Sequence, residues 1–446
     1  MQTAPPSANP SDNLHLLKVH QLLNAMDSGE VSSVDAVKGC IERINAREGD
    51  VRAFAHFDPE YALEQAARLD AMRAHGVVLG PLHGIPVAVK DIIDTCDMPT
   101  ENGLLADAGR MSDRDADVVR RLRAAGAVIL GKTVTTEAAF YAPSKTRNPN
   151  GLDHTPGGSS AGSAAAVADF MVPLAIGTQT NGSVIRPASF CGVLGFKPTY
   201  GSISTNGILP LSSSLDQVGV FGRCVRDIAL LADALTSSTF EPGQSYSADL
   251  EKDLITAPVL AFVPAPNWAD APDYAISAFA SLCDHFDNLI EHAPLVANGP
   301  EGLAMHKAVM AAEMARNLAH YTDDGPDVSE HLRAIVEDGR RVSAIDYLTA
   351  LSWRDEMRAT ISTVLDQYDA ILTPSSHGEA PKTLDQTGDP SASTLWTFLG
   401  FPAISLPMLV GSSGMPMGVQ LVGRPGDGGH LLRIARWLRR TSRDSE

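Results

Sequence analysis

The pattern of apolar and polar residues along the chain alternates between two kinds of segment. Short apolar runs rich in β-branched residues, such as residues 85–89 and 127–131, have the length and composition of buried strands. Between them, apolar residues recur at helical spacing, as in residues 115–125. Further helices are predicted at 14–47 (two helices split at Ser28-Gly29), 61–75, 163–171 and 429–440, and further strands at 172–176, 368–373 and twice within 401–422. This alternation predicts an α/β fold.

The order of these segments indicates one folded unit over residues 1–446, without internal repeats. Helices dominate the opening segment, about residues 1–60, and Ser32 or Ser33 is the expected N-cap of its second helix. After a polar, irregular stretch at 236–253, the chain becomes mostly helical again. We therefore predict a helical insertion at about 240–365 that shapes a substrate pocket.

Composition and charge exclude several classes of function. The chain is 44% apolar and 20% charged, which permits a large core and excludes global disorder. With 35 Lys and Arg against 53 Asp and Glu, the net charge of −18 disfavours binding to nucleic acid or to an anionic membrane. The most apolar long stretch, residues 164–177, is too short to span a bilayer and contains Asp169 and Pro173. We expect neither a nucleic-acid partner nor a membrane partner.

Cysteine and histidine usage gives no sign of a metal centre. Five scattered cysteines without a CxxC pair disfavour a disulfide framework and a zinc site, and no HExxH pair is present. We therefore expect no metal and no cofactor. Residues 1–13 lack a basic start followed by an apolar run, so no export signal is predicted and the expected location is the cytoplasm.

Two residues could carry chemistry, and each also has an ordinary structural explanation. Ser183 follows an apolar strand at a glycine-rich turn, where backbone N–H groups can converge on a developing oxyanion, but it could equally be an N-cap. Lys90 ends a buried strand, where desolvation would lower its pKa and make it a base. It could instead extend toward solvent or pair with Asp91 or Asp94.

A competing motif surrounds Ser160. Residues 158–162 read Gly-Ser-Ser-Ala-Gly and match G-x-S-x-G, the nucleophile elbow of α/β-hydrolases. That elbow requires a hydrophobic strand directly before it, whereas residues 148–156 are rich in Asn, Pro and Gly. Ser160 is therefore a poor candidate for the nucleophile.

The motifs together resemble the amidase signature family. The resemblance is densest in the Gly/Ser-rich stretch TPGGSSAGSAAAVA at 155–168, and it continues through NGS at 181–183 and FCGVLGFKPT at 190–199. Upstream, GIPVAVKD at 84–91 looks like the lysine segment of the family; SLDQ at 214–217 and MPMGVQ at 415–420 agree. The resemblance implies the amidase signature fold, in which helices cover both faces of a mixed central β-sheet.

By this resemblance, Ser183 is the nucleophile, Ser159 the bridging serine and Lys90 the base, and the peptide bond between Gly158 and Ser159 is cis. Lys90 would take a proton from Ser159, which takes one from Ser183 as it attacks the carbonyl carbon. The implied activity is hydrolysis of a C–N amide-type bond through an acyl-enzyme, releasing ammonia or an amine from a small-molecule amide. No histidine is required.

The oxyanion hole would come from the turn formed by Thr180, Asn181, Gly182 and Ser183. The commonest family pattern has glycine where Asn181 stands. Asparagine is among the residues that best tolerate a positive φ, so the turn can form, and its side chain would narrow the site or contact substrate.

A second departure bears on specificity. Many members have aspartate at the position of Gln179 and an arginine two residues after the nucleophile, whereas here Arg186 lies three residues after it. This variant resembles the malonamidase-type branch, in which the arginine faces a substrate carboxylate. Arg186 could instead pair with an acid of the protein. Thr178, Gln179 and Arg186 are the predicted substrate-binding residues.

Three alternative functions remain. The first is the glutamine-hydrolysing subunit of a tRNA-dependent amidotransferase, which shares the triad but works in a complex; the departures at Gln179 and Arg186 count against it. The second is a catalytically silent binding protein, which would have no reason to keep Lys90, Ser159 and Ser183. The third is an esterase that uses Ser160. The substrate is not readable from the sequence, and because many family members are dimers, a homodimer is the assembly to test.

Overall fold

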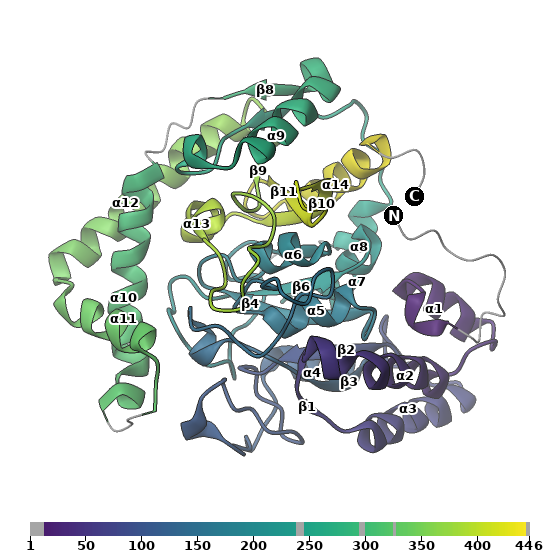
Figure 1. The fold of residues 1–446 in the computed structure, drawn as a ribbon. Helices are drawn as coiled ribbons and strands as arrows, with labels where there is room; N and C mark the ends of the chain where they lie inside the picture. The colour runs from purple at the N-terminus through teal and green to yellow at the C-terminus, as the bar shows by residue number, and fades with distance from the viewer. Residues whose placement is uncertain (1–12, 238–244, 294–298, 324–326, 443–446) are drawn as a thin grey trace.

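The computed structural model describes residues 13–237, 245–293, 299–323 and 327–442. Their strands pair into one mixed sheet, and helices pack on both of its faces (Figure 1). The predicted fold class, α/β with a mixed central sheet between helices, is confirmed. Predictions that concern residues 1–12 and 240–244 lie outside the described residues.

The elements have the following bounds. The strands are β1 Phe54–Phe57, β2 Pro86–Lys90, β3 Val128–Thr133, β4 Leu174–Gln179, β5 Leu194–Lys197, β6 Gln217–Gly222, β7 Leu260–Phe262, β8 Ile290–His292, β9 Ala370–Pro374, β10 Ala403–Val410 and β11 Pro416–Val422. The helices are α1 Val19–Asp27, α2 Ser33–Val51, α3 Pro59–Ala74, α4 Asp117–Ala124, α5 Ala161–Ala168, α6 Ile185–Cys191, α7 Val225–Leu235, α8 Tyr246–Leu250, α9 Asp273–Phe286, α10 Gly299–Asp323, α11 Glu330–Arg341, α12 Ala344–Leu365, α13 Ser391–Phe398 and α14 Gly428–Ser442.

The strand order of the sheet is β1-β3-β2-β4-β6-β5-β10-β11-β9-β7-β8. Strands β3, β2 and β4 run parallel to one another. Across the middle of the sheet, in the spatial order β4, β6, β5, β10, β11, β9, each strand pairs antiparallel with its neighbour. Strands β9, β7 and β8 are parallel again. The parallel pair β2 and β4 matters for the site, because the carboxyl ends of parallel strands meet at one edge of a sheet.

Strand β2 shows why helices cover both faces of the sheet. Its residues are all buried, as expected for a strand between two helical layers. Val87 and Val89 pack into one hydrophobic cluster and Ala88 into a second one on the opposite face. Since side chains alternate between faces, Lys90 points to the same side as Ala88.

Most predicted elements are present, and Ser32 is the N-cap of α2, accepting a hydrogen bond from the N–H of Asp35. Short strands were missed in both segments predicted as helical. Strand β1 lies in the opening segment, and β7 and β8 lie in the insertion, where they extend one edge of the sheet. Strands this short carry too few alternating positions to be recognised from the sequence.

The insertion also contains α8 and α9, and its helices α10, α11 and α12 lie together beside the sheet, at the left in Figure 1. Helix α10 also contacts α13, which brings the insertion near the carboxyl ends of β2 and β4. None of the helices in the described ranges is long and apolar enough to cross a membrane.

Candidate active site

The candidate site forms where β2 and β4 end side by side. Val89 pairs with Ile176 across the two strands, so Lys90, the last residue of β2, lies beside the end of β4. Strand β4 ends at Gln179, and the turn 180–183 follows directly and leads into α6. A glycine is required in β4, because a Cβ at Gly177 would lie 2.5 Å from Ser160 Oγ.

Lys90 is fully buried, and among the described residues its amine forms hydrogen bonds only with hydroxyl groups. Its Nζ lies 2.7 Å from Ser159 Oγ and 2.8 Å from Thr178 Oγ1. Burial lowers the pKa of Lys90 well below its usual value, and the negative charge of Asp216 opposes this effect only in part. The sequence-based expectation of a strand-end lysine that reaches solvent, or pairs with Asp91 or Asp94, is therefore not met at Lys90.

Ser159 and Ser183 line one small pocket, here called the site pocket. The peptide bond before Ser159 is cis, as the family resemblance implied. The Ser159 carbonyl accepts a hydrogen bond from the N–H of Thr136, which holds this loop against the segment after β3. The other polar residues of the site pocket are Tyr141, Thr180, Asn181, Arg186 and Thr387, and its apolar residues include Phe140 and Met310. No acidic residue of the described ranges lines it.

The turn 180–183 presents free backbone donors. Among the described residues, the N–H groups of Asn181, Gly182 and Ser183 donate to no protein acceptor. Unsatisfied N–H groups beside a nucleophile are what an oxyanion hole requires. Neither Asn181 nor Gly182 has a positive φ, so the left-handed conformation considered for Asn181 is not used.

Thr180 anchors the start of this turn to two other segments. Its carbonyl accepts a hydrogen bond from His306 Nε2 of α10 at 3.0 Å, and burial lowers the pKa of His306 to about 4, which keeps the ring neutral. The Thr180 hydroxyl donates to Asp216 Oδ1 at 2.6 Å. Asp216 also accepts the N–H groups of Leu211 and Ser212, both at 2.9 Å.

Two of the predicted substrate-binding residues do not line the site pocket. Gln179 is fully buried, and its Oε1 accepts the N–H groups of Val184 and Ile185 at 2.6 and 2.9 Å, which caps the start of α6. Its Nε2 donates to Thr397 Oγ1 at 2.9 Å. With its polar atoms engaged by the protein, Gln179 shapes the turn 180–183. Thr178 contacts Lys90 instead.

Arg186, the third predicted substrate-binding residue, does line the site pocket. It is 1% exposed, and burial lowers its pKa to about 10, so it stays charged at neutral pH. Its guanidinium donates to the carbonyls of Gly388 and Gly158 at 2.6 and 2.7 Å, and its Nε has no partner. No carboxylate of the described chain forms an ion pair with it.

Ser160 has a structural position. Its side chain is fully buried, and its hydroxyl donates to the carbonyl of Thr178 at 3.2 Å and accepts the N–H of the same residue at 3.3 Å. It thereby links the start of α5 to β4. The preceding strand that a nucleophile elbow needs is missing, as the sequence indicated.

Sequence reasoning missed several residues that complete the site. They are Tyr141 on the segment after β3, His306 on α10, and Thr394 and Thr397 on α13. Thr394 and Thr397 both donate to Asn181, to its side-chain oxygen and its carbonyl respectively. No local motif marks these residues, because they reach the turn from segments far away in the chain. Asp216, by contrast, lies in the SLDQ segment and could have been proposed from it.

Two groups of side chains could offer ligands to a metal ion: His20, Cys224 and Asp227, and Cys96, Asp97 and Asp115. Both groups have other bonding partners: Asp227 accepts the N–H of Val19 at the start of α1, and Asp97 and Asp115 form ion pairs with Arg123. None of these residues lines the site pocket.

Comparison with known proteins places this fold and site in a family. The family model Amidase matches residues 35–432, and the chain belongs to that family. It is therefore an enzyme of the amidase signature family, a class that acts on carbon–nitrogen bonds.

The similar proteins fall into two groups. A glutamyl-tRNA(Gln) amidotransferase subunit of Moorella thermoacetica is 35% identical, over 95% of this chain and 96% of that protein, and the corresponding subunit of Thermobifida fusca is 33% identical, over 91% and 92%. Among solved structures, the peptide amidase of Stenotrophomonas maltophilia is 26% identical with a TM-score of 0.82, covering 96% of this chain and 97% of that one. A structure from a vestigial protein complex, connected with the origins of an s-triazine catabolic enzyme, is 28% identical with a TM-score of 0.86, covering 95% and 98%.

Proposed function

We propose that this protein hydrolyses the amide bond of a small substrate that carries a carboxylate. The observation that supports this substrate class is the charge of the site pocket. Arg186 is its only charged lining residue, and no acid of the described chain forms an ion pair with it. A buried guanidinium with an unpartnered Nε is well suited to bind a carboxylate.

The proposed reaction begins with Lys90 as a neutral amine. Ser183 Oγ attacks the amide carbon and passes its proton to Ser159, whose own proton moves to Lys90 Nζ. The oxyanion that forms accepts hydrogen bonds from backbone N–H groups of the turn. The protons then return along the same path to the leaving nitrogen, and the C–N bond breaks to give an acyl-enzyme. Water hydrolyses this ester, so the products are a carboxylic acid and ammonia or an amine.

A second candidate is the glutamine-hydrolysing subunit of a tRNA-dependent amidotransferase. The curated relatives favour it, since proteins 32–35% identical over most of this chain are subunits of glutamyl-tRNA(Gln) amidotransferases. Glutamine is itself a small carboxylate-bearing amide, so the site pocket fits both candidates. They differ in assembly: the amidotransferase requires protein partners and the stand-alone amidase does not.

The test is ammonia and amine release by the purified protein on matched substrates. The panel holds carboxylate-bearing amides (malonamate, glutamine), their neutral methyl esters or isosteric amides, ureas and carbamates. We expect turnover of carboxylate-bearing members at least about 10-fold above that of neutral ones, as expected for one charge-assisted hydrogen bond. Equal kcat/KM for the charged and neutral members would contradict the substrate class.

Two serine variants test the mechanism in the same assay. Ser183→Ala should lose activity by about 10³-fold or more, because the nucleophile is absent. Ser160→Ala is the matched control, since it also removes a buried serine hydroxyl, one residue after Ser159. The Ser160 hydroxyl forms its hydrogen bonds with the backbone of Thr178 in β4. We expect the Ser160→Ala variant to retain activity. The reverse result would favour the esterase alternative. Protein partners that co-purify with the chain, together with turnover of glutamine only in their presence, would favour the amidotransferase.

A further inference from the structure

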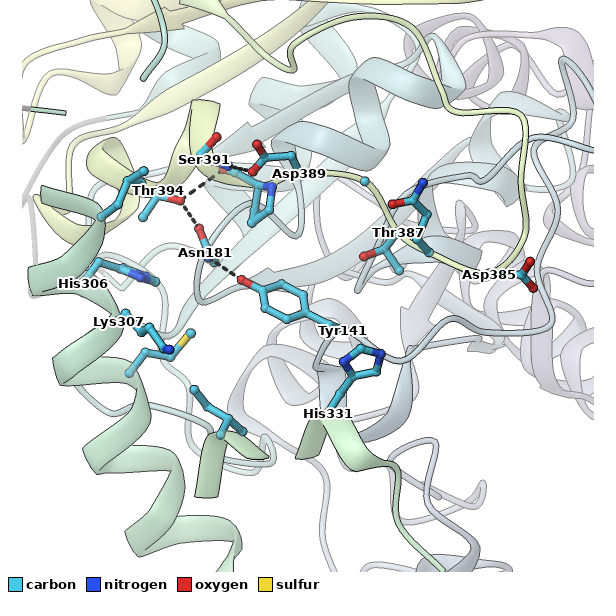
Figure 2. A pocket seen from close by; sticks show the side chains of 16 residues that line it. Tyr141, Asn181, His306, Lys307, His331, Asp385, Thr387, Asp389, Ser391 and Thr394 are labelled. Carbon is cyan, nitrogen blue, oxygen red and sulfur yellow. Dashed lines mark hydrogen bonds between the residues drawn. The ribbon is translucent and has the colours of Figure 1, made fainter. Parts of the chain in front are cut away.

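Tyr141 lines both the site pocket and a larger cavity beside it. It lines the site pocket with Ser159 and Ser183, and it also lines an outer cavity of about 440 Å³. Figure 2 shows the Tyr141 ring beside Asn181, with His331 of α11 drawn below the ring and His306 of α10 to the left; all four residues line the outer cavity. Asn181, Met310 and Thr387 also line both cavities, so Tyr141 belongs to the boundary between them.

The Tyr141 hydroxyl has one bonding partner and a proton left to donate. Its oxygen accepts a hydrogen bond from Asn181 Nδ2 at 2.9 Å, drawn as a dashed line in Figure 2. The Asn181 side chain is fixed in this orientation because Thr394 donates to its Oδ1. Within the described ranges, no acceptor is present for the phenolic proton. A phenol that lines a pocket with its proton unused is a hydrogen-bond donor for a ligand.

The backbone that carries Tyr141 adopts an uncommon conformation. Ala138 and Ala139, directly before Phe140 and Tyr141, both have positive φ, 43° and 53°. Two successive alanines in the left-handed region are costly, and such residues cluster at functional sites. The N–H groups of Ala138 and Ala139 donate to the carbonyls of Asn102 and Thr136, which holds this conformation. The segment is thus shaped to present the two aromatic residues that follow.

Arg186 lies close enough to Tyr141 for the two groups to interact electrostatically, and both line the site pocket. We propose that Tyr141 is a specificity-determining residue, whose hydroxyl, oriented by Asn181, donates a hydrogen bond to the substrate carboxylate that Arg186 binds. This inference rests on the proposed function. A carboxylate accepts several hydrogen bonds at once, so a neutral donor and a guanidinium can share it.

The proposal also explains the departure at position 181. A glycine there, as in the commonest family pattern, has no side chain to donate to the Tyr141 oxygen. With asparagine, the oxygen is occupied and the proton is directed away from the turn. Asn181 therefore acts on the substrate through Tyr141, as a positioning residue, and its own backbone remains free for the oxyanion.

The test compares Tyr141→Phe with the wild type on matched carboxylate and neutral amides. We expect KM for the carboxylate-bearing amide to rise about 10- to 100-fold, the effect of losing a hydrogen bond to a charged group, and KM for the neutral isostere to rise by less than about threefold. Tyr61→Phe is the matched control: it removes a phenol of α3 that donates to Asp97, away from the site pocket, and should not change the ratio.

Asn181→Gly provides the second arm. The measured quantity is the KM for the carboxylate-bearing amide divided by the KM for the neutral amide. Asn181→Gly should raise this ratio less than Tyr141→Phe does. The double variant should have the same ratio as Tyr141→Phe alone, because both substitutions act through one hydroxyl. An unchanged ratio in an active Tyr141→Phe enzyme would overturn the inference and show that the phenolic proton goes to the protein. That result differs from failure of the proposed function, in which the wild-type protein would not prefer carboxylate-bearing amides at all.

Discussion

Two buried lysines on neighbouring strands have opposite surroundings. Lys90 ends β2 and Lys132 lies in β3, and neither is exposed to solvent. Lys132 pairs with Val89 across the strands, so the two lysines point to opposite faces of the sheet. Lys132 forms an ion pair with Asp91 at 3.1 Å and donates to the carbonyl of Pro99. Within the part of the chain that the structure describes, the amine of Lys90 forms hydrogen bonds only with the hydroxyls of Ser159 and Thr178.

Burial alone therefore does not make a lysine a base. Desolvation lowers the pKa of both residues, but at Lys132 the adjacent carboxylate of Asp91 opposes the effect. At Lys90 the opposing charge is that of Asp216, which does not contact the amine, and the pKa falls much further. One lysine is held as half of a structural ion pair, and the other lies beside a serine hydroxyl with its pKa lowered much further by burial.

Among substitutions that test the difference between Lys90 and Lys132, we expect Lys90→Met to have the largest effect, and this effect is on activity. Removing the proton acceptor should lower kcat/KM by roughly 10²- to 10⁴-fold. Urea unfolding should change by only about 1 kcal/mol, because a neutral amine is replaced by an apolar chain of similar length. Steady-state kinetics and urea titration of the same preparation provide the check. A variant that keeps activity would remove Lys90 from the mechanism.

The matching substitution on the other strand should act on stability. Lys132→Met leaves the buried Asp91 carboxylate without its cation, and breaking a buried ion pair in this way costs about 3–5 kcal/mol of unfolding free energy. Adding Asp91→Asn should recover part of this loss, because the remaining group is then neutral. Urea titration measures both. If Lys132→Met were as stable as Lys90→Met, the two environments would not differ in the way described here.

This contrast also marks how far the sequence could lead. Both lysines follow apolar runs, and local pattern alone gives each the same expectation of a buried or paired strand-end lysine. The family resemblance singled out Lys90, Ser159 and Ser183, and the structure brings Lys90 and Ser159 into contact and both serines into one pocket. Local pattern alone favours the structural explanation for Lys90 and for Ser183, and Ser159 is indicated only by the resemblance.

The surroundings of the turn could not be predicted in the same way. Asn181 was recognised as a departure, but its partners Tyr141 and Thr394 lie far from it in sequence, and only tertiary packing makes them neighbours. Gln179 was expected to contact substrate, whereas its amide caps α6, an interaction across five residues that depends on the shape of the turn. Individual strands were predictable where an apolar run stood out, as in β2, whereas the three residues of β8 and the six residues of β6 were not recognised as strands.

The smallest expected effect comes from Asp216→Asn, which tests how the charge of Asp216 influences the pKa of Lys90. Its carboxylate raises the pKa of Lys90, against the larger effect of burial, so Asp216→Asn should lower that pKa further. The base form of Lys90 would then persist to lower pH, and the acid limb of the kcat/KM profile should move to lower pH. Asp216 itself has a pKa raised by burial to about 6, so the charge is present in the wild type only above this pH.

The wild-type and Asp216→Asn profiles should therefore differ most above about pH 6, where Asp216 is ionised. Because the Asp216 side chain also holds Thr180 and two backbone N–H groups, kcat at the optimum should fall in the variant as well, through a less ordered turn. Ser212→Ala is a control for this loss of order, since it removes a hydroxyl contact of the same loop to Glu313 without changing any charge. The Ser212→Ala variant should have a lower kcat, with the acid limb of its kcat/KM profile at the same pH as in the wild type. An upward shift of the limb in Asp216→Asn would mean that the titrating group in the profile is not Lys90, and the distinction between the two buried lysines would lose its functional meaning.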